Sequence, residues 1–513
     1  IPTGKESMSM TQKYKDDVVY APGTVIISAS GEVSDCRKVV EPVLVNDENK
    51  EILFVDFSFA ERALGGSAFA QSINKLGKVT PTVTSIQKFG NAFNIIQSLI
   101  EQELILAGHD ISSGGLITTL LEMCFSNNKG GMKVDLSGIG EADLAKVLFS
   151  ENPGIVIQAA DSEKVKKQLI DADVEFISIG FPVSYRKLRV TNFETELDFD
   201  IDTLRDLWFK TSYLLDRKQT KKELALERFK NYKKFELQYD FKDFTGKAAD
   251  LGIDLNRRKP SGIKAAIIRE KGVNGDREMA YAMYLAGMDV KDVHMTDLIS
   301  GRETLEEINM IVFVGGFSNS DVLGSAKGWA GAFKYNQKAK VALDNFYQRE
   351  DTLSLGVCNG CQVMVELGLV YPEHSIQPKM LHNESGKFES AFLNVDIEEN
   401  DSVMLGNMAG MKLGIWVAHG EGKFYLPFNE QQYNIPMKYS NDEYPGNPNG
   451  SHFSTAALCS DNGRHLVMMP HLERGFKPWH WPYYPAEKKM DEIAPWIKAF
   501  VNAKNWIKSK NKG

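Results

Sequence analysis

The chain has 513 residues, 43% of them hydrophobic and 25% charged, with a formal net charge of −8 and a pI near 5.7. This length suits roughly two to four globular domains. The acidic balance argues against a nucleic-acid binder, no apolar run reaches the roughly eighteen residues of a membrane span, and five irregularly spaced cysteines indicate a reducing cytoplasm rather than a disulfide framework.

The chain starts with Ile-Pro-Thr-Gly and continues as Gly-Lys-Glu-Ser-Met-Ser-Met over residues 4–10, without an initiator methionine. We interpret this start as the middle of a domain and expect the chain to be a piece of a longer polypeptide. Hydrophobic periodicity from residue 17 to residue 200 predicts a mixture of strands and helices. The expected strands are 25–29, 52–57 and 154–159, and the expected helices are 69–76, 91–103, 116–124 and 162–172.

The sequence Gly-His-Asp-Ile-Ser-Ser-Gly-Gly at 108–115 directly precedes the expected helix 116–124. A carboxylate (Asp110), a hydroxyl (Ser112) and two glycines at a helix amino terminus suit a phosphate with its magnesium ion. The same residues equally suit a capped loop in which Asp110 or Ser112 satisfies backbone donors. Both interpretations stay open.

From residue 204 to about 235 the pattern predicts a long helix, and residues 236–260 resemble a connector. Residues 217–234 contain eight basic side chains against two acidic ones. Because the chain as a whole is acidic, we interpret this tract as a solvated helix face rather than a nucleic-acid-binding segment.

A different pattern begins at Gly262. Strands are expected at 263–268, 310–314, 353–357 and 464–469, with a helix at 276–286. Strands alternating with helices predict a doubly wound, mostly parallel sheet, and such sheets bind ligands at the carboxyl edge of their strands. Gly315 and Gly316, Cys358, and His471 each follow one of these strands, so we expect them to converge there.

Cys358 ends the strand 353–357, Asn359 and Gly360 break the pattern, and a helix is predicted over 361–369. The thiol is therefore expected on a sharp strand-to-helix turn, exposed, where the helix amino terminus favours a thiolate. In extended chain, residues two apart face the same way, so Glu473 can orient the ring of His471. A thiolate, a base and a group that orients the base are the machinery of covalent acyl transfer.

Other segments add weaker signals. Gly315 and Gly316, followed by Phe317, allow backbone N–H groups to converge on an oxygen as in an oxyanion hole, although a glycine pair after a strand is often only a turn. His419, in His-Gly-Glu-Gly after the predicted strand 413–418, could supply a competing base, but we interpret it as part of a loop that shapes the pocket.

Cys358 and Cys361 form a Cys-x-x-Cys pair, which leaves two alternatives to acyl transfer. A thioredoxin-like dithiol also lies at a strand-to-helix turn. A zinc site would need a second close pair of ligands, whereas Cys36, Cys124 and Cys459 are scattered. Cys361 itself fits a small buried residue at the start of the apolar helix face.

Several motifs together resemble one family. Gly-Val-Cys-Asn-Gly-Cys-Gln (356–362), Gly-Gly-Phe-Ser (315–318), His-Gly-Glu-Gly (419–422), Asn-Pro-Asn-Gly-Ser (447–451) and Pro-His-x-Glu-Arg (470–474) are similar to the class I (triad) glutamine amidotransferase domain of the large, single-chain phosphoribosylformylglycinamidine synthases. Residues 4–10, Leu-Gly-Gly-Ser at 64–67 and residues 109–115 resemble the second AIR-synthetase-like module of this family.

The resemblance implies four segments. Residues 1–45 would be the remnant of an AIR-synthetase-like amino-terminal subdomain, and residues 46–203 its α+β carboxyl-terminal subdomain. Residues 204–260 would be a helical connector. Residues 261–513 would be a flavodoxin-like α/β glutaminase domain.

The family converts formylglycinamide ribonucleotide, glutamine and ATP into formylglycinamidine ribonucleotide, glutamate, ADP and phosphate in purine biosynthesis. The resemblance implies Cys358 as nucleophile, His471 as proton carrier and Glu473 as its partner, with Gly315, Gly316, Phe317, Asn359 and His419 around the glutamine and its oxyanion. Asp110 would be a Mg²⁺ ligand and Ser112 a contact of an auxiliary, structural ATP or ADP. Ammonia would pass internally to the synthetase site.

The resemblance has three departures. Leu472 stands where the family usually has proline, and Asn319-Ser320 stand where it usually has Tyr-Gly. The first synthetase module is missing, so the expected partners include the missing amino-terminal portion of the same polypeptide, and the synthetase site is expected to be incomplete. A non-catalytic nucleotide-binding piece is therefore a third alternative.

Overall fold

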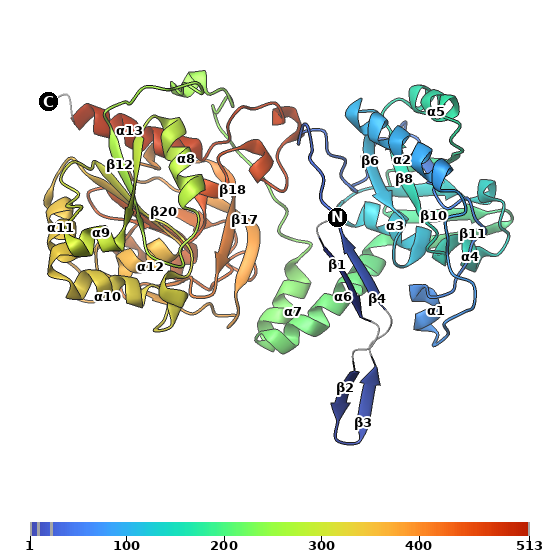
Figure 1. The fold of residues 1–513 in the computed structure, drawn as a ribbon, viewed down its shortest axis with the longest axis horizontal. Coiled ribbons are helices and arrows are strands. Elements are labelled where there is room, and N and C mark those ends of the chain that lie inside the picture. Colours follow the sequence, from blue (N-terminus) through green and yellow to red (C-terminus); the bar gives the residue numbers. More distant parts are fainter. Residues whose placement is uncertain (1–2, 8–10, 21–23, 511–513) are drawn as a thin grey trace. The chain divides into compact units, whose positions relative to one another are not determined.

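The computed structural model describes residues 3–7, 11–20 and 24–510. The chain divides into two compact units, residues 1–202 and residues 203–513. Each unit has its own sheet (Figure 1). No helix among the described residues is long and apolar enough to cross a lipid bilayer.

A seven-stranded mixed sheet forms the centre of the first unit. Its strands are β5 (Ile52–Asp56), β6 (Ile105–Asp110), β7 (Gly131–Asp135), β8 (Gly154–Ala159), β9 (Ile177–Val183), β10 (Lys187–Asn192) and β11 (Thr195–Asp200), in the order β11-β10-β7-β9-β5-β8-β6. Its helices are α1 (Ala68–Ser72), α2 (Ile86–Glu101), α3 (Gly115–Phe125), α4 (Leu144–Phe149) and α5 (Ser162–Asp171). Apolar side chains of α2 and α5 pack against β5 and β8.

Two short strand pairs precede this sheet. β1 (Thr3–Ser7) pairs with β4 (Thr24–Ser28), and β2 (Thr11–Tyr14) pairs with β3 (Asp17–Tyr20). The last three residues of the motif at 4–10 lie outside the described residues. The expected strands at 25–29, 52–57 and 154–159 are present within one residue at each end. The helix expected at 91–103 begins earlier, at Ile86, because the Ser85 side chain accepts a hydrogen bond from the backbone of Lys88.

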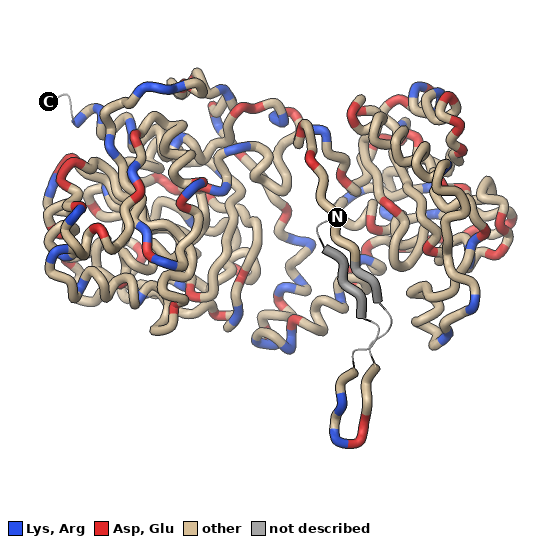
Figure 2. The backbone as a smooth tube through the Cα atoms, in the orientation of Figure 1, with Lys and Arg blue, Asp and Glu red and all other residues tan. Residues whose placement is uncertain are grey.

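The prediction of one long helix at 204–235 is wrong in one respect, because this segment forms two helices, α6 (Ile201–Gln219) and α7 (Lys222–Asn231). The break lets the two helices pack side by side, because Phe209 of α6 stacks on Tyr232, which follows α7, with ring centroids 4.2 Å apart. Seven of the eight basic side chains between 217 and 234 are exposed, as expected for a solvated face. Figure 2 colours the lysines and arginines blue along the backbone tube.

A nine-stranded sheet forms the centre of the second unit. Its strands are β12 (Lys264–Arg269), β13 (Asp289–His294), β14 (Met310–Phe313), β15 (Leu353–Val357), β17 (Glu389–Ile397), β18 (Lys412–His419), β20 (Asn434–Tyr439), β21 (Thr455–Cys459) and β22 (His465–Met468), in the order β13-β12-β14-β15-β22-β21-β20-β17-β18. The neighbours from β13 to β22 pair in parallel, and those from β22 to β18 pair antiparallel. A separate antiparallel pair is formed by β16 (Lys379–Leu381) and β19 (Lys423–Tyr425).

Helices cover the parallel half of this sheet. They are α8 (Asp276–Ala286), α9 (Met295–Ser300), α10 (Lys327–Tyr335), α11 (Gln337–Gln348), α12 (Asn359–Glu366) and α13 (Ile497–Lys510). α8 packs with α13, whereas α9 to α12 form a second group (Figure 1). This arrangement is the doubly wound α/β fold that the alternating strands and helices predict.

The register of the parallel strands brings the three predicted site segments together. Phe313 of β14 pairs with Gly356 of β15, and Val357 of β15 pairs with Met468 of β22. The residues after these strands therefore meet at one edge of the sheet.

The strand ends at Val357 as predicted, but the helix predicted over 361–369 begins two residues earlier, at Asn359, and ends at Glu366. Gly360 serves close packing instead: a Cβ there would lie 2.0 Å from the carbonyl oxygen of Phe313.

Candidate active site

Cys358 occupies the sharp turn between β15 and α12. Its φ is 53° and its ψ is −110°, which is rare for a residue with a side chain. Its backbone N–H donates to the carbonyl of Met468 over 2.9 Å, which fixes the turn against β22. Such strain, maintained by the surrounding strands, is a feature of functional sites.

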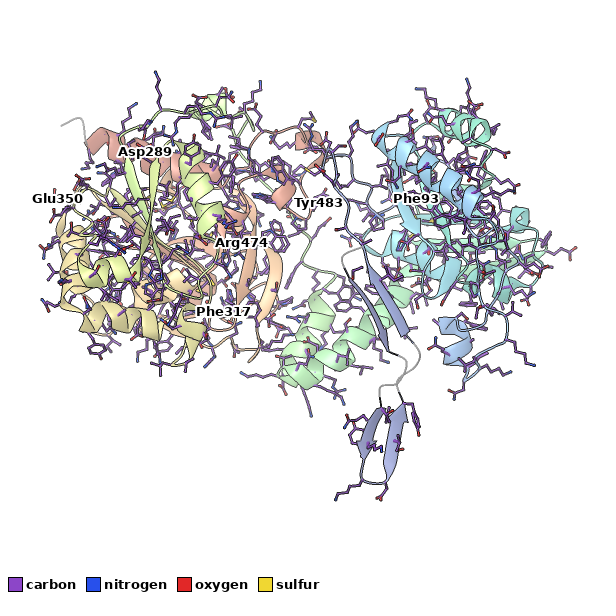
Figure 3. The ribbon with its side chains drawn as sticks, in the orientation of Figure 1. Phe93, Asp289, Phe317, Glu350, Arg474 and Tyr483 are labelled. Carbon is purple, nitrogen blue, oxygen red and sulfur yellow. The ribbon has the colours of Figure 1, made fainter. Side chains whose placement is uncertain are left out.

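The expectation that the Cys358 thiol is exposed is wrong, since the residue is only 7% exposed. The side chain lines a cavity of about 140 Å³, and its Sγ donates to the carbonyl of Ala418 over 3.6 Å. The antiparallel half of the sheet causes this burial, because Ala418 and His419 at the end of β18 and Phe388 before β17 also line the cavity. Phe317 and Arg474, two further lining residues, are labelled in Figure 3.

His471 and Glu473 form a buried pair. His471 Nδ1 lies 2.6 Å from Glu473 Oε1, and the two side chains are 2% and 1% exposed. Burial alone would lower the pKa of His471, but the Glu473 carboxylate and the Cys358 side chain outweigh burial and raise this pKa to about 10. His471 Nε2 is buried without a hydrogen-bond partner among the described residues.

The local backbone of this pair differs from the extended chain that we expected. Glu473 lies in a short 3₁₀ turn, Leu472–Arg474, and His471 precedes the turn. The backbone N–H of His471 donates to the carbonyl of Trp416 in β18 over 2.9 Å. Leu472 is fully buried, so the turn is anchored in the core and positions Glu473 against the imidazole.

Gly315 separates the cysteine from the histidine. A Cβ at this position would lie 2.9 Å from Cε1 of His471 and 3.2 Å from Cβ of Cys358. The two side chains therefore flank one backbone position that has no room for a methyl group. Gly316 has a φ of +131°, and a Cβ there would lie 2.4 Å from Cα of Val273.

Asn359 is buried and links two loops rather than lining the cavity. Its Oδ1 accepts from the backbone of Ser318 over 3.3 Å, and its Nδ2 donates to Asp321 over 3.3 Å and to Gln362 over 3.0 Å. Phe317 does line the cavity and is half exposed. Asn359 thus ties the segment after β14 to the start of α12.

His419 also lines the cavity, with a side chain that is 2% exposed. Burial and the neighbouring His471 lower the pKa of His419 to about 3, so this ring is neutral at physiological pH. The two histidines of the site therefore differ in charge state, and their different environments are the cause.

Cys361 lies in the core, not in the cavity. It is fully buried, and burial raises its pKa well above the ordinary value for a thiol. No group of three or more His, Cys, Asp or Glu residues that could hold a metal ion occurs in the described part of the chain. These environments favour neither the dithiol nor the zinc alternative.

Sequence reasoning assigned no site role to several lining residues, namely Asn274, Asp321, Ser325, Gln362, Phe388 and Arg474. Gln362 and Arg474 end two of the quoted motifs, and Asp321 lies three residues after a third, so these motifs could have suggested all three residues. Asn274 and Phe388 come from distant loops, and only the tertiary fold brings them to the cavity. Burial raises the pKa of Asp321, with hydrogen bonds opposing and the nearby Glu421 adding to the rise.

The predicted metal and nucleotide residues lie in the first unit, at the end of β6. The Asp110 side chain is 77% exposed, and Ser112 is exposed too. The backbone N–H of Gly114, before α3, donates to the Glu151 carboxylate over 2.9 Å. An exposed carboxylate that lies 3.5 Å from His109 Nδ1, beside an N–H group that is already paired, does not make a metal site by itself. The described residues therefore do not fit a complete magnesium–nucleotide site.

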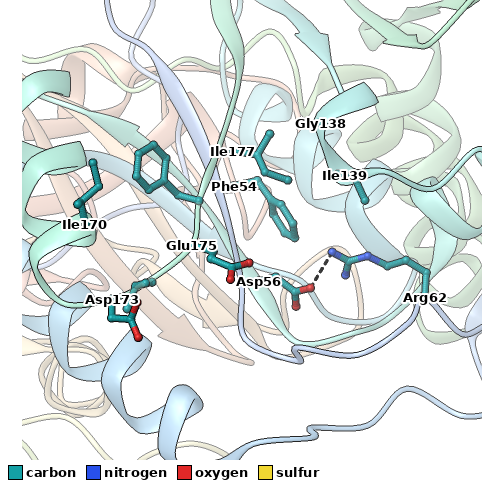
Figure 4. Close-up of a pocket in the computed structure, with 11 residues that line it drawn as sticks. Phe54, Asp56, Arg62, Gly138, Ile139, Ile170, Asp173, Glu175 and Ile177 are labelled. Carbon is teal, nitrogen blue, oxygen red and sulfur yellow. Dashed lines mark hydrogen bonds and ion pairs between the residues drawn. The ribbon is translucent and has the colours of Figure 1, made fainter.

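A larger cavity of about 570 Å³ in the first unit contains none of the predicted site residues (Figure 4). Arg62 lies there with its guanidinium 5.2 Å from the centre of the Phe54 ring and 3.0 Å from the Asp56 carboxylate. Asp173 and Glu175 add two further carboxylates to its lining.

Two family models match the chain. Residues 262–507 match the CobB/CobQ-like glutamine amidotransferase domain, and residues 59–181 match the AIR synthase related protein, C-terminal domain. Both matches agree with the α/β units described above.

Curated relatives match almost the whole chain. The probable phosphoribosylformylglycinamidine synthase, chloroplastic/mitochondrial, of Arabidopsis thaliana is 39% identical over 536 residues, and the phosphoribosylformylglycinamidine synthase of Homo sapiens is 38% identical over 539 residues. The matches cover 99% and 98% of this chain but 38% and 40% of the relatives. The chain therefore spans about two-fifths of their length. A solved structure, PurLQS from Thermotoga maritima, is 25% identical with a TM-score of 0.38, covering 48% of this chain and 99% of that chain.

Proposed function

We propose that this chain, which resembles the carboxyl-terminal part of phosphoribosylformylglycinamidine synthases, carries the glutamine-hydrolysing site of such an enzyme. One observation supports this proposal above the others: Cys358 and His471 flank the same glycine, and His471 is paired with Glu473 over 2.6 Å. Nucleophile, base and orienting carboxylate are the three parts of a cysteine acyl-transfer site.

The raised pKa of His471 implies a protonated imidazole beside the Cys358 sulfur at neutral pH. The Cys358 thiolate attacks the side-chain carbonyl carbon of glutamine. His471 gives its proton to the amide nitrogen as the C–N bond breaks, so ammonia leaves and a thioester remains. His471 then takes a proton from water, the hydroxide adds to the thioester, and the thiolate departs as glutamate is released.

Two backbone groups could hold the oxyanion that forms in both steps. The N–H of Asn359 begins α12, where first-turn N–H groups have no partner within the helix. The N–H of Gly316 follows the glycine between Cys358 and His471, and no backbone partner is found for it among the described residues. Positive helix-end charge and fixed N–H groups stabilise a developing oxyanion.

The overall reaction belongs to this proposal as well. The intact enzyme would use the ammonia, ATP and formylglycinamide ribonucleotide to form formylglycinamidine ribonucleotide. Asp110 and Ser112 would contribute to an auxiliary ATP or ADP site with Mg²⁺, completed by residues upstream of those present here. The cytoplasmic location predicted from cysteine content remains a prediction.

Labelling with a glutamine-analogue electrophile, such as a chloroketone, tests the glutaminase assignment. We expect one label, on Cys358, and protection by glutamine. Cys358→Ala should lose both the label and glutamine hydrolysis. Continued hydrolysis in this variant would refute the assignment.

Cys361→Ser is the matched control, because this thiol is buried behind the site. A glutaminase that uses only Cys358 keeps its turnover in Cys361→Ser within a fewfold of the unmodified chain. A dithiol mechanism requires Cys361, so its activity would be lost, and a reversible Cys358–Cys361 disulfide would be detected by mass spectrometry.

A further inference from the structure

Phe388 forms part of the wall of the cavity that contains Cys358. Its ring centroid lies 6.1 Å from that of Phe317, another lining residue. A Cβ on Gly420 would lie 3.9 Å from the Phe388 ring, so the ring also lies beside the loop after β18. Phe388 is nevertheless 48% exposed. Contacts of its neighbours in the chain therefore contribute to holding it in place.

The residues on either side of Phe388 both form ion pairs with the connector helices α6 and α7. Lys387 is paired with Asp216 of α6, and Glu389 Oε2 accepts from Arg228 of α7 over 2.6 Å. Asp216 and Arg228 are themselves 3.4 Å apart. The four side chains form a network of alternating charges, Lys387–Asp216–Arg228–Glu389, that runs from one neighbour of Phe388 to the other.

This four-charge network is largely removed from solvent. The Glu389 and Asp216 side chains are 4% and 10% exposed, and those of Lys387 and Arg228 are partly buried. Glu389 Oε1 also accepts from the hydroxyl of Tyr444 over 2.8 Å. A buried ion pair is held firmly, because breaking it leaves an uncompensated charge in the interior. The network therefore fixes the chain on both sides of Phe388.

The backbone of the same segment is joined to the end of β18. Glu389 begins β17 and pairs with His419. Asn383 Nδ2 donates to the carbonyl of Lys387 over 3.0 Å and to the carbonyl of His419 over 2.7 Å. The segment that carries Phe388 is thus held by β18 through its backbone and by α6 and α7 through its charged side chains.

We propose that Asp216 and Arg228, in the connector helices, are positioning residues that hold Phe388 as a wall of the glutamine cavity. They act through Lys387 and Glu389. The cysteine, histidine and glutamate of the site follow other strands, β15 and β22, so the network affects the binding of glutamine more than the breaking of its C–N bond. This inference rests on the proposed glutaminase function and adds to it a role for helices that the sequence indicates only as a connector.

The test measures kcat and KM for glutamine hydrolysis by the whole chain in Asp216→Asn and Lys387→Met. We expect KM to rise roughly 10- to 100-fold, because a displaced positioning element can cost about 10²-fold. The kcat should change less than about threefold, as for the loss of binding alone. Lys387→Arg keeps the positive charge and should keep KM within about threefold of the unmodified chain.

Lys438→Met is the matched control. It removes another ion pair of the second unit, that of Lys438 with Glu430 over 2.6 Å. Neither residue lines the cavity or adjoins a residue that does. Its KM for glutamine should therefore be unchanged. A rise as large as that in Lys387→Met would overturn the inference, because loss of any ion pair would then have the same effect.

Phe388→Ala shows whether the network acts through the cavity wall. This variant should raise KM by itself, and adding Asp216→Asn to it should raise KM less than about twofold further. A merely structural effect of Asp216→Asn would instead multiply with that of Phe388→Ala. Labelling of Cys358 by methyl methanethiosulfonate, which needs no bound glutamine, reports whether the site is folded. Lys387→Met, at the more exposed end of the network, serves for the same comparison if Asp216→Asn does not fold.

An unchanged KM in both network variants would overturn the inference. Multiplying effects in the double variant, or a loss confined to kcat, would overturn it as well, because the network would then not act through the position of Phe388. Each of these results leaves the glutaminase function standing, since the unmodified protein still hydrolyses glutamine. Failure of the unmodified protein to hydrolyse glutamine would overturn both.

Discussion

At the scale of single residues, the two histidines of the cavity differ in charge at neutral pH: His471 is protonated and His419 is neutral. His471 has a carboxylate partner that raises its pKa, whereas His419 has an amide partner and a cationic neighbour, so burial keeps its pKa low. The same type of side chain is thus protonated in one place and neutral in the other at physiological pH.

The proton-carrier role predicts a change in pH dependence for Glu473→Gln. The carboxylate raises the pKa of His471, so replacing it with a neutral amide lowers that pKa, and the imidazolium is lost at a lower pH. The alkaline limb of kcat/KM for glutamine should move down by about one to three pH units. Turnover at neutral pH should fall on the order of 10²- to 10⁴-fold.

This variant is checked by a pH–rate profile of glutamine hydrolysis. Glu278→Gln is the matched control, because its carboxylate lies 3.6 Å from Arg474 at a partly exposed site rather than against His471. Its alkaline limb should be unchanged. An unshifted limb in Glu473→Gln would contradict the assigned role of the carboxylate.

Sequence reasoning located the residues of the site better than their surroundings. Cys358, Gly315 and His471 each follow a parallel strand, and parallel strands end at a common edge, so their proximity follows from local pattern. The burial of Cys358 could not be predicted in this way. It depends on Ala418 and Phe388 from the antiparallel half, whose position is set by tertiary pairing rather than by local sequence.

At the scale of elements, the turn after β14 is strained. Asn319, Ser320 and Asp321 have successive φ values of 52°, 57° and 48°, which place three residues with side chains in the left-handed region. Within the described part of the chain, the exposed side chain of Ser320 makes no hydrogen bond that would offset this strain.

We therefore expect Ser320→Gly to stabilise the second unit by about 0.5–1 kcal/mol, because relief of the left-handed strain exceeds the added freedom of glycine in the unfolded chain. Val322→Gly is the matched control, because Val322 is 81% exposed and has an ordinary φ of −56°. Glycine at this position should destabilise the second unit by about 0.5–1 kcal/mol. All seven tryptophans lie between residues 208 and 506, so urea unfolding followed by tryptophan fluorescence reports on this unit. A lower urea midpoint for Ser320→Gly would contradict the expectation.

Gly360 shows why element boundaries were less predictable than element types. A glycine after a strand commonly indicates a turn, yet here it allows α12 to approach β14. The pattern at 204–235 gave the helical character correctly but not the break, since the stacking of Phe209 on Tyr232 becomes possible only when the chain folds back.

At the scale of the whole molecule, the segments that match the curated relatives account for about two-fifths of their length. If this chain is supplied alone with glutamine, ATP and formylglycinamide ribonucleotide, we expect it to form glutamate and ammonia but no formylglycinamidine ribonucleotide. Adding the polypeptide that corresponds to the upstream part of the relatives should restore the amidated product, measured by mass spectrometry. Amidation by the chain alone would show that residues 1–203 contain a complete synthetase site.

Strand β18 is an edge strand of the nine-stranded sheet, and its first residue pairs with Asp240, far upstream in the sequence. The other end of the strand touches the backbone of His471 and the sulfur of Cys358. A one-residue shift of β18 would break the contacts that this strand makes with both His471 and Cys358.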